Sequence, residues 1–479
     1  VVGGISAADN SKRSFAQAGV TALIFNEFRF LFVFLPIILV GCYWIVPARY
    51  RRELLLAASL VFYGLSGLEH VTALIAGLIW VYVWTSNNKF EESNFRLASA
   101  IIGPLAALFY YKYMSFAVET IQQISGEEFT SRFSIFENVL LPAGISFFTF
   151  QMIAFAIDRY RGDLPANPPF RTFALYICFF PQLVAGPILR FSAVSAAIGG
   201  LEKFCPKRAD FDAALGYIVF GLAAKVLLAD GLADALGPFS AQPENLSRDG
   251  ALFVIFAYSF QIYFDFYGYS LVAIGLGRLF GFEFPDNFLR PYEARNPRDF
   301  WRRWHVSLSY WIRDYLYLSL GGNRSYIRNI IIVFAVCGLW HGAGWNFVVW
   351  GLYHAGLVAG YASIARWWDK MPAFQQRFLN FVLISIGWLL FQYNFTDAFA
   401  LLESLARPAT MTSAGPMLWD WGVFVLAGVI CFALNIEKTI TWSAGLRNGS
   451  VYYSGTLGLV FVVTLAFLES SQTFIYFRF

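Results

Sequence analysis

The stretch CGLWHGAGWN, residues 337–346, places a histidine among tryptophans and glycines inside a long apolar run, 329–365. The chain has only 4 histidines in 479 residues. Three of them, His305, His341 and His354, fall within one stretch of fifty residues, 305–354. Ionisable side chains at membrane depth are costly and are usually kept for function, so we expect the site here.

The composition indicates an integral membrane protein. The chain is 58% hydrophobic and 19% aromatic, and only 14% of its residues are charged, against about 25% in soluble proteins. A net charge of +4 is too small to indicate a nucleic-acid partner. Residues 1–22 are polar and small and predict an N-terminal tail, and 23–479 predict a single membrane domain.

Ten apolar runs approach the length that a helix needs to cross about 30 Å of hydrocarbon. These runs are 28–46, 53–68, 71–85, 97–118, 139–157, 213–229, 251–280, 378–395, 417–436 and 451–469. Three shorter or broken runs, 172–189, 304–320 and 329–365, predict re-entrant or half-crossing segments. The expected fold is therefore all-α and polytopic, with about ten transmembrane helices.

The distribution of basic residues predicts which loops are cytoplasmic. Alternate threading from the basic loop at 49–52 places both ends of the histidine-bearing stretch on the cytoplasmic face. It also requires 172–189 to enter and leave on one face, and the sequence FPQLVAGP at 180–187 would break a helix there. The histidine-bearing stretch would turn at 321–322 and again at 342–344.

The first histidine follows a run of aromatic and basic residues, FWRRWHVSLSYWIRDY at 300–315. At helical spacing the aromatic and apolar positions form one stripe, which predicts an interfacial helix. The members of this stripe are Trp301, Trp304, Leu308, Trp311 and Tyr315. Spacing alone equally allows His305 to cap or pack at the level of the lipid headgroups.

His341 lies at a predicted glycine bend. Gly342 and Gly344 lack a Cβ and would let a backbone or a ligand come close to the imidazole. Histidine can take a proton from a hydroxyl near neutral pH and return it to a leaving group, as acyl transfer requires. The alternative is a neutral histidine bonded to a carbonyl within the helices. Because no His-Glu-x-x-His pattern is present, we predict no metal site.

Several longer motifs resemble the membrane-bound O-acyltransferase superfamily, and within it the bacterial alginate O-acetyltransferase branch. They are FPQLVAGP at 180–187, NFLRPY at 287–292, FWRRWH at 300–305, RDYLY at 313–317, GGNR at 321–324, LWHGAGW at 339–345 and FIYF at 474–477.

This resemblance implies helices around a central funnel or tunnel, with the core catalytic stretch at about 285–365. His341 matches the superfamily's invariant histidine and His305 its second active-site position. The resemblance further implies a multi-pass protein of the bacterial cytoplasmic (inner) membrane that uses acetyl-CoA as donor and no bound cofactor. The acceptor would be a hydroxyl of an exported polysaccharide such as alginate, reached with periplasmic acetyltransferase partner proteins.

We expect His341 to act as general base and His305 to orient the acyl group or stabilise the oxyanion. His354 would be supportive or structural. Candidate substrate-binding residues surround these histidines: Arg302, Arg303, Trp304, Gly342, Gly344, Trp345 and Asn346. Asn346 or Trp345 would donate to the oxyanion. The arginines would attract the donor's phosphates, although positive-inside bias alone also explains them.

Two alternatives stay open at this point. One is transfer of D-alanine or another acyl group to a cell-envelope polymer, and the other is a transporter for a lipid-linked sugar. The sequence does not distinguish among alginate, cellulose, another exopolysaccharide and peptidoglycan as the acceptor.

Overall fold

The computed structural model describes residues 23–86, 89–125, 139–164, 167–406, 416–436, 438–440, 451–472 and 474–475. All regular elements in these ranges are helices, and all ten predicted apolar runs contain one, so the all-α polytopic class is confirmed. Six of the described helices are long and apolar enough to cross a membrane: Leu68–Thr85, Asn94–Ser125, Arg208–Ser240, Arg248–Leu279, Trp345–Trp368 and Ala373–Gln392. The count of ten crossings stays a prediction, and the tail at 1–22 lies outside the described residues.

The chain forms two compact units. Among the described residues, the first consists of those within 23–207 and Leu276–Phe284, and the second of those within Arg208–Gly275 and Pro285–Ile475. The single membrane domain at 23–479 therefore stays a prediction. The candidate catalytic stretch, 285–365, falls within the second unit.

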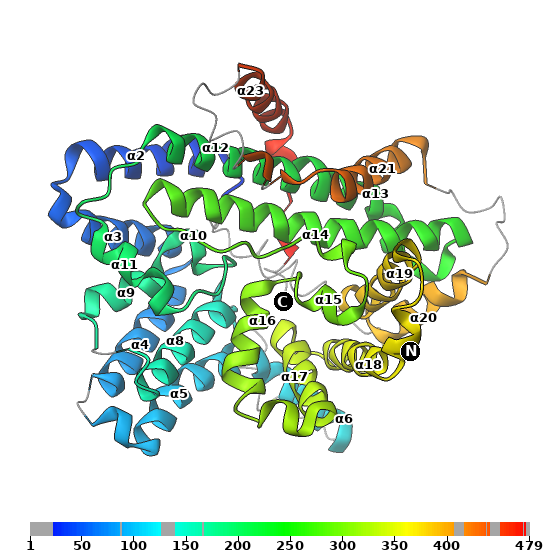
Figure 1. The fold of residues 1–479 in the computed structure, drawn as a ribbon, viewed down its shortest axis with the longest axis horizontal. Coiled ribbons are helices and arrows are strands. Elements are labelled where there is room, and N and C mark those ends of the chain that lie inside the picture. Colours follow the sequence, from blue (N-terminus) through cyan, green and yellow to red (C-terminus); the bar gives the residue numbers. More distant parts are fainter. Residues whose placement is uncertain are drawn as a thin grey trace. The chain divides into compact units, whose positions relative to one another are not determined.

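The first unit holds the N-terminal helices. They are the continuous helix Phe30–Ile45 (η1, α2 and η2), α3 (Arg51–Gly64), α4 (Leu68–Thr85), α5 (Asn94–Leu108) continuing through η5 into α6 (Met114–Ser125), α8 (Ile145–Tyr160), α9 (Phe170–Cys178), α10 (Phe180–Leu183) and α11 (Phe191–Gly200). Helices α4, α5 and α8 pack side by side (Figure 1). Many large apolar side chains on these helices are exposed, as lipid-facing positions require.

The run at 172–189 is broken, as predicted. Helix α9 ends at Cys178, and the four-residue α10 is followed by turns and irregular backbone. Side chains replace part of the lost helical hydrogen bonding: Ser59 Oγ accepts from Phe180 N at 3.1 Å, and the Tyr176 hydroxyl donates to Leu189 O at 2.7 Å. The broken backbone is buried in protein, which is the condition for irregular structure at membrane depth.

The second unit holds the remaining helices. They are α12 (Arg208–Ala223), η7 (Ala224–Ala229), α13 (Asp230–Ser240), α14 (Arg248–Leu279, of which Arg248–Gly275 belong to this unit), α15 (Pro297–Trp301), α16 (Val306–Trp311), η10 (Ile312–Tyr317), α17 (Tyr326–His341), α18 (Trp345–Trp368), α19 (Ala373–Gln392), α20 (Phe395–Ser404), α21 (Leu418–Ala433) and α23 (Val451–Ala466). Helix α18 packs against α15, α17 and α19 (Figure 1).

Helices α17 and α18 form a close hairpin around the predicted bend at 342–344, which is confirmed. A Cβ at Gly338 would lie 2.1 Å from the carbonyl oxygen of Phe347, and one at Gly351 would lie 2.1 Å from that of Phe334. The two backbones therefore meet because both contact positions are glycine. Helix α18 has 24 residues and is long enough to cross a membrane by itself, beyond the predicted half-crossing.

Candidate active site

His305 interrupts the helix that the aromatic stripe predicts. Helix α15 ends at Trp301, α16 begins at Val306, and His305 between them has a left-handed φ of 45°. The prediction of one continuous interfacial helix over 300–315 is therefore wrong. The aromatic side chains keep their pattern, but they lie on two short helices with the histidine at the junction.

The backbone around His305 is paired with the loop that precedes α15. Val306 N donates to Asn287 O, and Leu289 N donates to Arg303 O, both at 2.9 Å. His305 and Arg290 are the two non-glycine residues with positive φ among the described residues, and both lie in these paired segments. Such a conformation costs roughly 1–3 kcal/mol and persists where the surroundings impose it, often at functional sites.

Asn287 sets the tautomer of His305. The Ser307 backbone N–H can only donate, so the Asn287 atom 3.2 Å from it is the oxygen Oδ1. The Ser307 hydroxyl also donates to Oδ1, at 2.9 Å, and His305 Nδ1 lies 3.3 Å from it. Because Oδ1 only accepts, Nδ1 carries the hydrogen and Nε2 presents its lone pair.

Burial keeps His305 neutral. The residue is 1% exposed, and the ring of Phe266 meets the imidazole edge to face at 4.7 Å between centroids. His305 lies outside the six candidate membrane spans. Desolvation holds its pKa below the usual range, so the uncharged ring is the form present near neutral pH. A neutral imidazole with its hydrogen on Nδ1 accepts at Nε2 and does not donate there.

Trp340 brings His305 and His341 together. Its ring lies 6.1 Å from that of His305 and 4.9 Å from that of His341, measured between centroids. His341 is the last residue of α17 and is 3% exposed. Trp350 and Phe391 cover it edge-on at 5.1 and 5.4 Å. Two imidazoles from segments far apart in sequence therefore contact one indole.

His354 also contacts Trp350, with ring centroids 4.9 Å apart. The residue is fully buried, and neither ring nitrogen has a hydrogen-bond partner within the described part of the chain. Trp301 meets it edge to face at 5.0 Å. Gly387 makes room for it, since a Cβ there would be 2.8 Å from His354 Nε2. The surroundings of His354 are those of a packed core residue.

The glycines of the bend accommodate protein side chains. A Cβ at Gly342 would lie 2.1 Å from the ring of Phe347, and one at Gly344 would lie 2.5 Å from Oδ1 of Asn346. Asn346 Nδ2 donates to Leu390 O at 3.1 Å and so ties α18 to α19. Trp345 is 51% exposed. The structure thus gives Asn346 a structural contact, and the role of Asn346 or Trp345 as an oxyanion donor stays a prediction.

The basic and aromatic residues before His305 divide into two groups. Trp304 is buried against Trp388, with ring centroids 4.8 Å apart, and Arg303 pairs with Asp299 at 2.8 Å. These residues hold the local structure. Arg302 is exposed, and its side chain makes no hydrogen bond or ion pair with the described residues, so its guanidinium is available to an anion.

Arg302 lines a cavity of about 430 Å³ in the second unit. Two further arginines, Arg298 and Arg313, share its wall, and Trp301 and Phe334 form part of its apolar lining. These two aromatic residues also contact His354. The cavity therefore places cationic groups next to two aromatic residues that pack on His354.

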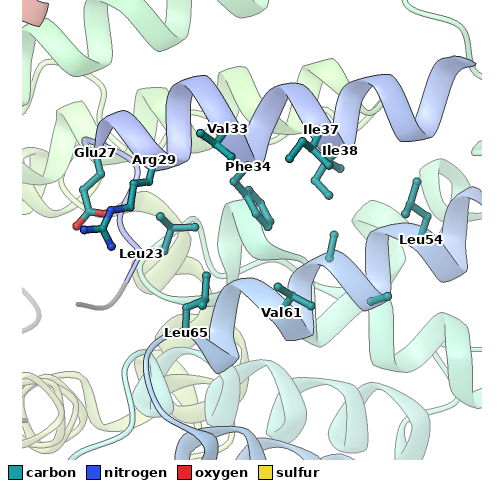
Figure 2. A pocket seen from close by; sticks show the side chains of 12 residues that line it. Leu23, Glu27, Arg29, Val33, Phe34, Ile37, Ile38, Leu54, Val61 and Leu65 are labelled. Atoms are coloured by element: carbon teal, nitrogen blue, oxygen red, sulfur yellow. The ribbon is translucent and has the colours of Figure 1, made fainter. Parts of the chain in front are cut away.

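A second cavity, of about 730 Å³, belongs to the first unit. Figure 2 shows it between the helices Phe30–Ile45 and α3, with Glu27 and Arg29 at one end and apolar side chains such as Ile37, Ile38 and Val61 along its length. It contains no histidine, cysteine or serine. We therefore place the candidate active site in the second unit.

Sequence reasoning missed Asn287 and Trp340 as site residues. The available signal for Asn287 was a polar residue at the start of an otherwise aromatic and basic motif, NFLRPY. Trp340 directly precedes His341, but no pattern in the sequence predicted its contact with His305. Within the described residues, no three His, Cys, Asp or Glu side chains are grouped as metal ligands would be.

The chain is similar to several known membrane acyltransferases. The model of the membrane-bound O-acyltransferase family matches residues 9–398. The chain is 37% identical over 391 residues to the "Probable alginate O-acetylase AlgI" of Azotobacter vinelandii, covering 78% of this chain and 76% of the relative. It is 33% identical to the peptidoglycan O-acetyltransferase of Helicobacter pylori (81% and 80% covered) and 27% identical to the teichoic acid D-alanyltransferase of Bacillus subtilis (63% and 78% covered).

The chain therefore belongs to the membrane-bound O-acyltransferase family, and it is a multi-pass membrane O-acyltransferase. The resemblance to the alginate O-acetylase branch is confirmed. Membership in an enzyme family also argues against the transporter alternative.

Proposed function

We propose that this enzyme moves an acetyl group from acetyl-CoA, on the cytoplasmic side of a bacterial inner membrane, toward hydroxyls of an exported polysaccharide. His341 is the general base in this proposal. The observation that carries it is the shared contact of His305 and His341 with Trp340, which gathers two imidazoles in one buried aromatic site.

The proposed reaction is a single acyl transfer. His341 removes the proton from the acceptor hydroxyl as the oxygen attacks the thioester carbonyl. The resulting oxyanion collapses, the carbon–sulfur bond breaks, and protonated His341 returns the proton to the departing thiolate. His305 accepts a hydrogen bond from another donor group of the substrate through its Nε2 lone pair, because its Nδ1 hydrogen faces Asn287. This tautomer favours an orienting role over oxyanion stabilisation.

The arginine-lined cavity supports a phosphate-bearing donor. Arg298, Arg302 and Arg313 lie on its wall, and Arg302 has no competing partner within the described residues. Guanidinium groups bind phosphate through paired N–H donors. Asp314 takes two bonds from Arg313 at 2.6 and 3.0 Å, so Arg302 is the stronger candidate for the donor's phosphates.

The names of the relatives support the proposed acceptor. Two of those compared carry names for O-acetylation of alginate and of peptidoglycan, which supports an exported polysaccharide as the acceptor here. Periplasmic acetyltransferase partners would complete the delivery. Transfer of D-alanine from a carrier protein is the second candidate function. It is supported by the similarity to a teichoic acid D-alanyltransferase, whose identity to this chain is lower than that of the O-acetyltransferases.

The test is acetyl transfer or release from radiolabelled acetyl-CoA by purified protein in detergent or nanodiscs. His341→Ala should lower turnover about 10²- to 10⁴-fold, the usual contribution of a general base. His70→Ala is the matched control, because His70 is also a buried histidine but lies in the first unit. Equal turnover by His341→Ala and wild type, at equal protein levels, would show that His341 is not the general base. Wild-type protein without activity toward acetyl-CoA would show that acetyl-CoA is not the donor.

A further inference from the structure

A buried cluster of three charged side chains lies in the second unit. Lys225 Nζ is 2.6 Å from Asp230 Oδ1 and 2.6 Å from Asp265 Oδ1. The three side chains are only 6%, 6% and 2% exposed. Lys225 and Asp230 belong to the candidate span Arg208–Ser240 and Asp265 to the span Arg248–Leu279. Ionisable groups at such positions are costly and usually have a function.

Two features of the backbone bring the cluster together. Lys225 lies in the π-helical turn η7, and Asp230 follows it directly. Residues five apart are about 140° apart around an α-helix, whereas the wider π turn brings them toward one face. Gly221 and Gly268 let the two helices touch, since a Cβ at either would lie within 2.7 Å of the other's carbonyl oxygen.

The second oxygen of each aspartate binds the C-terminal segment, defined here as residues 471–472 and 474–475. Asp230 Oδ2 accepts from Ser471 Oγ at 2.7 Å and from Gln472 N at 3.2 Å. Asp265 Oδ2 accepts from Ile475 N at 2.8 Å. Each carboxylate thus bridges the lysine and the C-terminal segment, and the segment's N–H and O–H groups help to satisfy a cluster with more negative than positive charges.

The C-terminal segment in turn contacts the wall of the histidine site. Phe474 stacks on Tyr269 at 4.8 Å and packs on Phe266 at 5.6 Å between ring centroids. Phe266 is the ring that meets His305 edge to face at 4.7 Å. A contiguous set of contacts therefore runs from the charged cluster through Phe474 and Phe266 to His305.

We propose that Lys225, Asp230 and Asp265 form a clamp that positions His305 by holding the C-terminal segment against Phe266. The three charged residues are positioning residues and do not touch the reacting atoms. The inference rests on the proposed role of His305 in acyl transfer. In this proposal Asp230 and Asp265 must both be charged. Each carboxylate accepts hydrogen bonds from the Lys225 ammonium and from the C-terminal segment at the same time.

The first experiment measures hydrogen exchange and needs no activity. In Asp265→Asn, an amide cannot accept on both sides, so either Lys225 or Ile475 loses its bond. Peptides covering 471–475 should exchange roughly tenfold to a hundredfold faster, the effect of losing a hydrogen bond to a charged group. Peptides covering 303–308 should also exchange faster, because Val306 N and Ser307 N are bonded to Asn287 beside His305.

Asp234→Asn is the matched control. Asp234 is an exposed carboxylate that binds the same segment, through Gln472 Nε2 at 2.9 Å, but it belongs to no buried cluster. It should leave exchange at 303–308 unchanged. Phe474→Ala serves as a second variant that keeps every charge, and it should loosen 303–308 without disturbing the ion pairs.

The second experiment separates positioning from general stability, with acetyl-CoA as the probe. Asp265→Asn and Phe474→Ala should each lower kcat about tenfold with KM for acetyl-CoA unchanged, and the double variant should be no worse than either, because coupled residues are non-additive. The clamp would be overturned if exchange became faster at 471–475 but stayed at the wild-type rate at 303–308. A wild-type kcat in both variants would also overturn it. Inert wild-type protein would count against acetyl-CoA as donor, while the exchange result would still decide on the clamp.

Discussion

Two buried polar regions of the second unit are built in opposite ways. Around Lys225 every carboxylate oxygen has a donor, and ion pairs of 2.6 Å dominate. Around His341 the neighbours are aromatic rings, and the single amide of Asn287 orients His305. Buried charges whose partners are all satisfied hold a structure in place, whereas the region around His341 is built mainly from aromatic packing. The comparison distinguishes the charged region around Lys225, which stabilises the structure, from the aromatic region around His341, where we propose that the reaction takes place.

The largest effect is expected from Lys225→Met. The change leaves two carboxylates buried without their cation, which costs about 3–5 kcal/mol for a buried pair. The folded fraction recovered from membranes should collapse, as measured by fluorescence-detected size exclusion. Lys370→Met, at an exposed lysine of the same unit, should be recovered like wild type. Normal recovery of Lys225→Met would show that the charged region does not hold the fold.

The next effect concerns the histidine region and pH. Asn287→Asp places a carboxylate at His305 Nδ1 and should raise the pKa of His305 by about 1–3 units. The uncharged form of His305, which accepts the substrate's hydrogen bond, is lost as pH falls through this pKa, so the acidic limb of kcat/KM should move to higher pH. A pH profile with acetyl-CoA measures this shift. Asn394→Asp, at an exposed helix cap, is the control, and identical profiles would separate His305 from the chemistry.

A smaller effect is expected at the cavity. Arg302→Gln removes a guanidinium with no other partner in the described chain, so KM for acetyl-CoA should rise about tenfold, as expected for a lost charged hydrogen bond. Steady-state kinetics should show little change with S-acetyl-cysteamine, which lacks phosphates. Arg366→Gln changes an exposed arginine in the last turn of α18 and should leave both values unchanged. An equal change for both thioesters would contradict phosphate binding.

The smallest effect is expected for His354→Met. This substitution replaces two unpartnered ring nitrogens with an apolar side chain of similar size, which tends to be neutral or slightly stabilising. Thermal unfolding in detergent should show a change below about 1 kcal/mol, and acetyl turnover should be preserved. A hundredfold loss of turnover at an unchanged unfolding midpoint would assign His354 to the chemistry.

Much of the fold was predictable because apolar length and helix breakers act locally. The ten apolar runs became helices, and the breaks at 180–187 and 342–344 fell where proline and glycine predicted them. The aromatic stripe over 300–315 misled because periodicity cannot detect a single left-handed residue. The φ of 45° at His305 is imposed by pairing with Asn287 and Leu289, which are far enough away in sequence to leave no periodic signal.

The sequence by itself determined the membrane-embedded helical class, the family and the histidines to consider, since composition and contiguous motifs carry that information. Only the tertiary structure decided that Trp340 joins His305 to His341, that Asn287 sets the tautomer, and that Lys225 binds two aspartates which also hold the C-terminal segment. These contacts depend on glycine-lined helix crossings and on loop pairing across long sequence separations. Such contacts arise from packing, so no local pattern in the chain encodes them.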